Sequence, residues 1–142
     1  MEDRLLGWRE VEDGFRFGRV RWNVERARLF NRWAADRLRV NVVRVEEHDR
    51  TIGYGNRGVH YYNHKIVIGT GSPGYHIARH DCRELWAITI HEITHYLDRT
   101  HRRSFTRNLR RVYELWWEYA TTTTYGRVWL RQKGAILESV RS

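Results

Sequence analysis

The segment of this chain with residues best suited to chemistry is His91-Glu92-Ile93-Thr94-His95. On a helix the two histidines lie one turn apart, so both imidazoles can reach one metal ion at about 2.0–2.1 Å. The glutamate beside them can act as general base on a water that the metal polarises. A solvated helix face that happens to carry two histidines would show the same pattern. The neighbouring segments therefore have to decide between that face and a zinc-hydrolase site.

The residues before this segment predict the helix that such a site needs. Asp81-Cys82-Arg83-Glu84 matches a capping box, which begins a helix about ten residues before His91. One broad arc of that helix carries Leu85, Trp86, Thr89, Ile90, Ile93, Tyr96 and Leu97. We expect this arc to pack on a core, and the opposite face, with both histidines, to line a cleft.

His101 is the predicted third ligand. A straight helix would carry it about 15 Å beyond His91 and off the histidine face, so the chain must turn after about Leu97. The next helix carries an apolar stripe of Phe105, Leu109, Val112, Trp116 and Tyr119. One turn back from Phe105 is His101, which should therefore face the first helix.

Other residues could serve the site instead. Glu114 and Glu118 could supply a third ligand from the second helix, but they lie opposite its apolar stripe and should face water. Asp98 lies on the histidine face. We expect it to cap the helix or to orient a ligand imidazole by a hydrogen bond, without binding the metal itself. His76 and His80 precede the helix and are predicted to be surface residues, since three ligands and a water complete a catalytic zinc.

These residues resemble a known family, the SprT-like zinc metallopeptidases, which include the Spartan proteases and related minimal zincins. The resemblance covers about residues 24–120 and rests on the two histidines with Glu92, on His101-Arg102-Arg103-Ser104-Phe105, on Leu29-Phe30-Asn31, on a Val-rich strand at 40–45, on Gly53-Tyr54 and on Lys65-Ile66-Val67-Ile68. Many relatives have Gly where this chain has Arg102. The short gap before His101 is more like that of the small WLM-type and YgjP-type peptidases.

The resemblance implies an α+β minimal zincin, with an N-terminal helix on a small twisted sheet and two helices that carry the metal. It also implies Zn²⁺ held by His91, His95 and His101, with Glu92 as the catalytic base. The implied substrates are proteins or peptides, including proteins bound or crosslinked to DNA. The same histidine spacing occurs in metzincins, but these need a methionine below the zinc, and the only methionine here is Met1.

The remaining elements are predicted from local patterns. Helical spacing of apolar residues begins after Asn23, a plausible N-cap. Strands are expected at 40–45, 59–62 and 65–68, and the edge near 64–68 could pair with an extended substrate. The expected elements also include a strand or arm at 15–22, a loop at 69–80, a helix end at 121–124 and a short final element at 125–142.

Composition indicates one intracellular domain. The chain has 142 residues, 41% of them hydrophobic, which suffices for a single core spanning 1–142. It has no apolar run long enough for a bilayer and no signal-peptide pattern at its start, so we expect a cytoplasmic or nucleoid-associated protein without a membrane partner. Its single cysteine, Cys82, cannot form an internal disulfide, which fits a reducing compartment.

The net charge of +9 leaves two interpretations open. All basic residues except Lys65 and Lys133 are arginines, which suit phosphate, and Arg103, Arg107 and Arg110 are the candidates for contacts with nucleic acid. The alternative is a merely solvated basic surface. The competing function is therefore a non-enzymatic, nucleic-acid-binding module whose zinc is structural.

Overall fold

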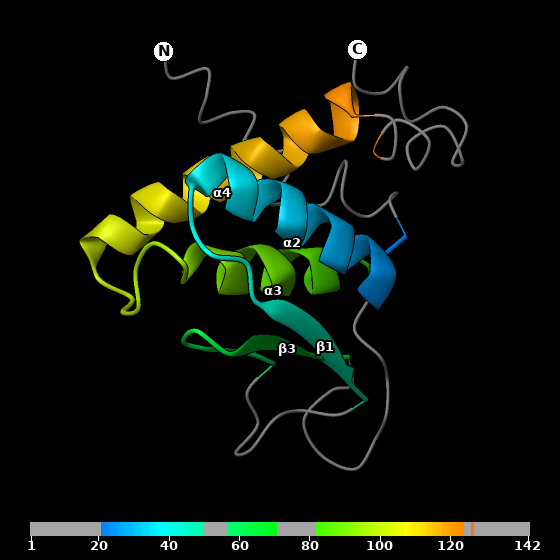
Figure 1. Ribbon diagram of the computed structural model, residues 1–142, viewed down its shortest axis with the longest axis horizontal. Helices are drawn as coiled ribbons and strands as arrows, with labels where there is room; N and C mark the ends of the chain where they lie inside the picture. Colours follow the sequence, from blue (N-terminus) through cyan, green and yellow to red (C-terminus); the bar gives the residue numbers. More distant parts are fainter. Residues whose placement is uncertain (1–20, 50–56, 71–81, 124–125, 127–142) are drawn as a thin grey trace.

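The computed structural model describes residues 21–49, 57–70, 82–123 and 126 (Figure 1). Its helices are α2 (Val24–Leu38), α3 (Cys82–Thr94) and α4 (Arg103–Thr122), and its strands are β1 (Arg44–His48), β2 (Gly58–Tyr61) and β3 (Lys65–Gly69). The predicted α+β class is confirmed for these residues. Asp81, His76, His80, Gly53-Tyr54 and most of the segments predicted at 15–22 and 125–142 lie outside the described residues.

The strands form a mixed sheet in the order β1-β3-β2. β1 runs parallel to β3 with Arg44 opposite Lys65, and β2 runs antiparallel to β3 with Gly58 opposite Ile68. The central strand is β3, and its Ile66 and Ile68 are fully buried. The predicted free edge near 64–68 is therefore wrong, because β3 is paired on both sides; among the described strands, the edge nearest α3 is that of β2.

The first strand begins later than its β-branched sequence predicts, at Arg44 rather than at Val40. The backbone of Val43 is bonded to one side chain of α2 and to one of the turn after α3 instead of to a strand. Its N–H donates to the Tyr96 hydroxyl at 3.0 Å, and its carbonyl accepts from Asn31 Nδ2 at 2.8 Å. These bonds use the polar groups that strand pairing would need.

α2 begins where its sequence indicates. Asn23 is the N-cap, and its Oδ1 accepts a hydrogen bond from the Arg26 N–H at 2.8 Å. At the other end Arg39 adopts the left-handed conformation with φ 59°, and its N–H bonds back to the last turn. The helix buries Ala27, Phe30 and other small or apolar residues against the core.

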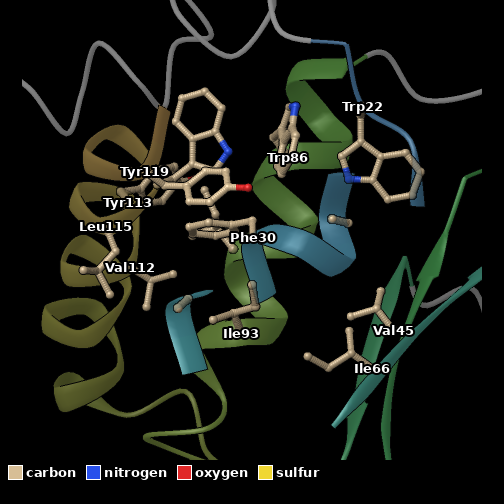
Figure 2. Close-up of a cluster of buried hydrophobic side chains, with 14 of the residues drawn as sticks. Trp22, Phe30, Val45, Ile66, Trp86, Ile93, Val112, Tyr113, Leu115 and Tyr119 are labelled. Atoms are coloured by element: carbon tan, nitrogen blue, oxygen red, sulfur yellow. The ribbon is translucent and has the colours of Figure 1, made fainter. Parts of the chain in front are cut away.

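The helices share one core, part of which Figure 2 shows. α2 and α3 contact the sheet, while α4 packs on α2 and α3 (Figure 1). Aromatic rings join the three helices: Phe30 lies 5.5 Å from Tyr119, and Trp86 lies 5.4 Å from Trp116, between centroids. The predicted inward arcs are confirmed, since the members of the α3 arc up to Ile93 are buried, as are those of the α4 stripe except the half-buried Leu109. Among the described residues, no helix is long and apolar enough to cross a membrane.

A polar network fixes the end of α3 against this core. The Tyr96 hydroxyl donates to Asn31 Oδ1 at 2.8 Å while it accepts from the Val43 N–H. Asn31 is only 2% exposed, so its amide must find partners inside the protein. Because Tyr96 follows His95 directly, this network holds the segment that carries the second histidine of the site.

Tyr96→Phe should lower the free energy of unfolding by about 1–3 kcal/mol, because it leaves the Val43 N–H and the Asn31 carbonyl oxygen without the hydroxyl. Urea denaturation of the metal-free protein measures this. Tyr61→Phe is the matched control, since Tyr61 is 41% exposed, and should change stability by less than about 0.5 kcal/mol. Equal losses in the two variants would show that the network does not stabilise the fold.

Candidate metal centre

The turn that the third ligand requires is present after α3. Hydrogen bonds there tighten to the i→i+3 type: His95 N–H to the Glu92 carbonyl at 3.2 Å and Leu97 N–H to the Thr94 carbonyl at 2.9 Å. The chain then leaves the helix axis and begins α4 at Arg103. The predicted turn after about Leu97 is confirmed.

His91, His95 and His101 come together at this turn. Their candidate ligand atoms all lie within 4.8 Å of one another, and the Nε2 atoms of His91 and His101 are 3.0 Å apart. Nitrogens bound about 2.0–2.1 Å from a tetrahedral metal would be about 3.3 Å apart. The three imidazoles are therefore close enough to bind one metal ion, and His101 faces α3 as predicted, although it is solvent-exposed.

Asp98 orients one of these rings, and does so through its backbone. His95 Nδ1 lies 2.7 Å from the Asp98 carbonyl oxygen. A carbonyl only accepts, so Nδ1 must carry the proton and Nε2 is left with its lone pair for a metal. The Asp98 carboxylate instead accepts from Ser104 Oγ and from the Thr100 N–H and Oγ1, bonds that lower the pKa of the carboxyl and fix the turn before α4.

Phe105 forms an apolar floor under all three imidazoles. Its ring centroid is 4.9 Å from that of His91, 4.8 Å from that of His95 and 4.9 Å from that of His101, and the side chain is 5% exposed. Burial lowers the pKa of His91 to about 4, with the neighbouring imidazoles adding to the effect, and burial also lowers the pKa of His95. Neutral rings are what metal ligation needs.

Glu92 is buried beside the triad by a close approach of β2. A Cβ atom at Gly58 would lie 2.9 Å from Glu92 Oε2 and 2.7 Å from Ile88 Cγ2, so a larger residue there would displace one of them. Glu92 is 5% exposed, and this burial raises the pKa of its carboxyl to about 8. The sequence marks Gly58 only as part of a turn region and does not indicate this contact.

His60 is a site residue that the sequence analysis missed. Its Nδ1 donates to the Glu92 carbonyl oxygen at 2.7 Å, and its ring meets the Tyr96 ring edge-on at 4.8 Å between centroids. Burial lowers the pKa of His60, so the ring is held neutral. The sequence could have indicated His60 through its position two residues after Gly58 on a strand, because that spacing places both residues on the face towards α3.

One cleft of about 410 Å³ contains the triad and Glu92. Its lining comprises Gly58, Val59, His60, Tyr62, His91, Glu92, His95, Arg99 and His101. The sequence did not predict the contributions of β2, Tyr62 and Arg99. It is a concave site with one buried carboxylate beside three metal-ligand candidates, which is an arrangement suited to acid–base chemistry next to a metal.

The other candidate residues lie away from this cleft. Glu114 is exposed, and Glu118 pairs with Arg37 of α2 at 2.7 Å, so the structure brings neither to the triad. Arg103 and Arg107 are exposed on α4, whereas Arg110 is half-buried. The prediction that these three side chains face outward is therefore confirmed for Arg103 and Arg107 and not for Arg110.

Comparisons with protein-family models, with curated proteins and with solved structures find no match to this chain.

His101→Ala should weaken metal binding by at least tenfold and reduce the stabilisation that added metal gives, because bound metal stabilises the folded state by mass action. Titrations with Zn²⁺ and with Co²⁺, each paired with thermal unfolding, measure both effects. Asp98→Ala should do less, since it keeps the carbonyl that holds His95. A larger loss in Asp98→Ala than in His101→Ala would exclude His101 as the third ligand.

The metal-free protein should lose stability as the pH rises from 6.5 to 8. The raised pKa of Glu92 means that the folded state keeps a proton that the unfolded state releases near pH 4.5, so this contribution is lost as pH rises through about 8. The lowered pKa of His91 acts in the opposite direction, but only between about pH 4 and 6.5. Above that window Glu92 dominates, with a slope of at most about 1.4 kcal/mol per pH unit.

Denaturant unfolding with chelator present, repeated across this pH range, measures the slope. In Glu92→Gln the loss between pH 6.5 and 8 should disappear, because the amide does not titrate. An identical slope in the two proteins would mean that the buried carboxyl is already ionised in the folded state.

Proposed function

We propose that this protein is a zinc-dependent metallopeptidase with a minimal-zincin fold similar to that of the SprT-like enzymes. The observation that carries the proposal is the buried carboxylate of Glu92 in one cleft with His91, His95 and His101. A helix that merely carried histidines would have no reason to bury a carboxyl group, which is costly when no charged partner stands by, and Glu92 has none among the described residues.

Zinc fits the donor set better than harder ions do. Three imidazole nitrogens suit Zn²⁺, whereas Mg²⁺ and Ca²⁺ prefer oxygen ligands. Three protein ligands are also the usual number for a catalytic zinc, which keeps one position for substrate or water. A zinc ion held by these residues would supply a Lewis acid next to Glu92.

Glu92 is proposed as the general base and then the proton donor. Its pKa of about 8 in the metal-free cleft is raised by burial, and a nearby cation would favour the ionised form that a base needs. A carboxyl poised in this way can take a proton from water and return it to the leaving amine. Gly58 and His60 support this role, since one lets β2 approach the carboxyl and the other bonds to the Glu92 backbone.

The β2 edge is the proposed site for the substrate backbone. Gly69 N–H bonds to the Arg57 carbonyl at 2.7 Å, so residues 57, 59 and 61 direct their polar groups to β3. By the alternation of an antiparallel pair, the backbone groups of Gly58 and His60 point the other way, to the edge of β2 beside the cleft, which pairs with no described strand. An extended peptide could pair there by strand addition.

The competing function is the non-enzymatic nucleic-acid module with a structural zinc. The exposed Arg103 and Arg107 and the net charge of +9 are compatible with binding to phosphates. A structural site, however, gains nothing from a buried Glu92 in its cleft. We therefore propose DNA only as an associated partner, with DNA-associated proteins as substrates in line with the SprT-like resemblance.

The test is Glu92→Gln in the zinc-loaded protein, assayed for casein cleavage. Hydrolysis should fall by about 10²–10⁴-fold while zinc content stays unchanged, because glutamine keeps the shape and removes the base. Glu114→Gln is the matched control, since Glu114 is exposed on α4, and should keep full activity. Undiminished cleavage by Glu92→Gln would refute the enzyme assignment.

A further inference from the structure

Arg99 and Tyr62 form one wall of the metal cleft. The guanidinium carbon of Arg99 lies 3.3 Å from the centroid of the Tyr62 ring, and both residues line the cavity that contains the three histidines. Tyr62 is 55% exposed, so the stacked pair faces solvent rather than the core. A guanidinium held on an aromatic face has its N–H groups around its rim, where they can bind a planar anion with two hydrogen bonds.

Among the described residues, no carboxylate pairs with Arg99. The nearest acidic residue in sequence, Asp98, is held by Ser104 and Thr100. Stacking on Tyr62 thus fixes the position of the cation without using its hydrogen-bond donors. The guanidinium of Arg99 is therefore held in place with its N–H groups available to an anion that is not one of the described residues.

The charge of the cleft favours the same ligand. Among the described residues that line it, Glu92 is the one carboxylate and Arg99 the one permanent cation. A second hollow shares His60 and Tyr62 with the cleft, and the part of its lining that the structure describes includes Arg39 and no carboxylate. A substrate that crosses Tyr62 therefore meets arginines on both sides, which attract negative charge.

We propose that Arg99, stacked on Tyr62, binds a carboxylate of the peptide substrate and makes the enzyme selective for acidic peptides. The inference rests on the proposed peptidase function. An extended peptide advances about 3.3 Å per residue, so a side chain within a few residues of the cleaved bond can reach another wall of the same cleft. The carboxylate belongs to an Asp or Glu side chain or to the peptide's C-terminus, two sources that share this chemistry.

Binding is measured first, apart from catalysis. Zinc-loaded Glu92→Gln protein is titrated with fluorescent peptides in which Glu is exchanged for Gln at single positions, each with a free and an amidated C-terminus. At one position Glu should bind about tenfold more tightly than Gln. A dependence on the free C-terminus alone would assign the carboxylate to the chain end. Equal binding by all peptides, or none, would overturn the proposal.

Second-site variants in the same Glu92→Gln background identify the residue responsible. Arg99→Gln should abolish the preference, Tyr62→Ala should weaken it, and Arg99→Glu should reverse it in favour of Lys at the same peptide position. Arg111→Gln removes the same charge from the exposed surface of α4 and should leave the preference intact. The same loss in Arg111→Gln and Arg99→Gln would mean that net charge alone acts, and would overturn the proposal.

Cleavage assays with active protein separate this inference from the proposed function. Exchanging Glu for Gln should raise KM about tenfold with little change in kcat, as expected for lost binding energy. Cleavage without acidic preference overturns only the inference, whereas no cleavage of any peptide or of casein overturns the peptidase function. If single-stranded DNA displaces the acidic peptide and loses its own affinity in Arg99→Gln, the wall is a phosphate site and the peptide proposal fails.

Discussion

The site depends on the contact between β2 and α3 at Gly58. There the strand backbone approaches the helix so closely that a single added carbon would lie 2.9 Å from the Glu92 carboxylate. This approach buries Glu92 and raises the pKa of its carboxyl. It also lets His60, on the same face of the strand, reach the Glu92 carbonyl. A wider spacing of the two elements would hydrate the carboxylate and remove both effects.

Local sequence patterns were sufficient for the helices and the triad. The inward arc of α3, the turn after Leu97 and the stripe of α4 all follow from helical periodicity, which relates residues only a few positions apart along the chain. The direction of His101 followed from the position of Phe105, which the structure places against all three imidazoles. A cluster of candidate metal ligands on α3 and on the connection between α3 and α4 is therefore largely predictable from one segment of sequence.

The rest of the site depends on contacts between distant residues. The strand predicted at 40–45 starts at Arg44 because Asn31 of α2 and Tyr96 of the turn after α3 bond to Val43. β-branched composition predicts a strand but not which neighbour takes its hydrogen bonds. Strand order likewise decides that β2, rather than β3, borders the cleft. For this reason the sequence did not reveal that Gly58 and His60 belong to the site.

The packing of the histidines argues against a solvated helix face. Exposed imidazoles would keep their ordinary pKa near 6.5 and would have no reason to cluster. Here His91 and His101 bring their Nε2 atoms to 3.0 Å, burial lowers the pKa of His91 to about 4, and a buried phenyl ring covers one side of the cluster. Burial on this apolar ring lowers the pKa of His91 and of His95 and gains little by itself. Imidazoles that are already neutral bind a metal ion more tightly, because no proton has to be displaced first. Metal binding would therefore give this cluster a favourable free energy.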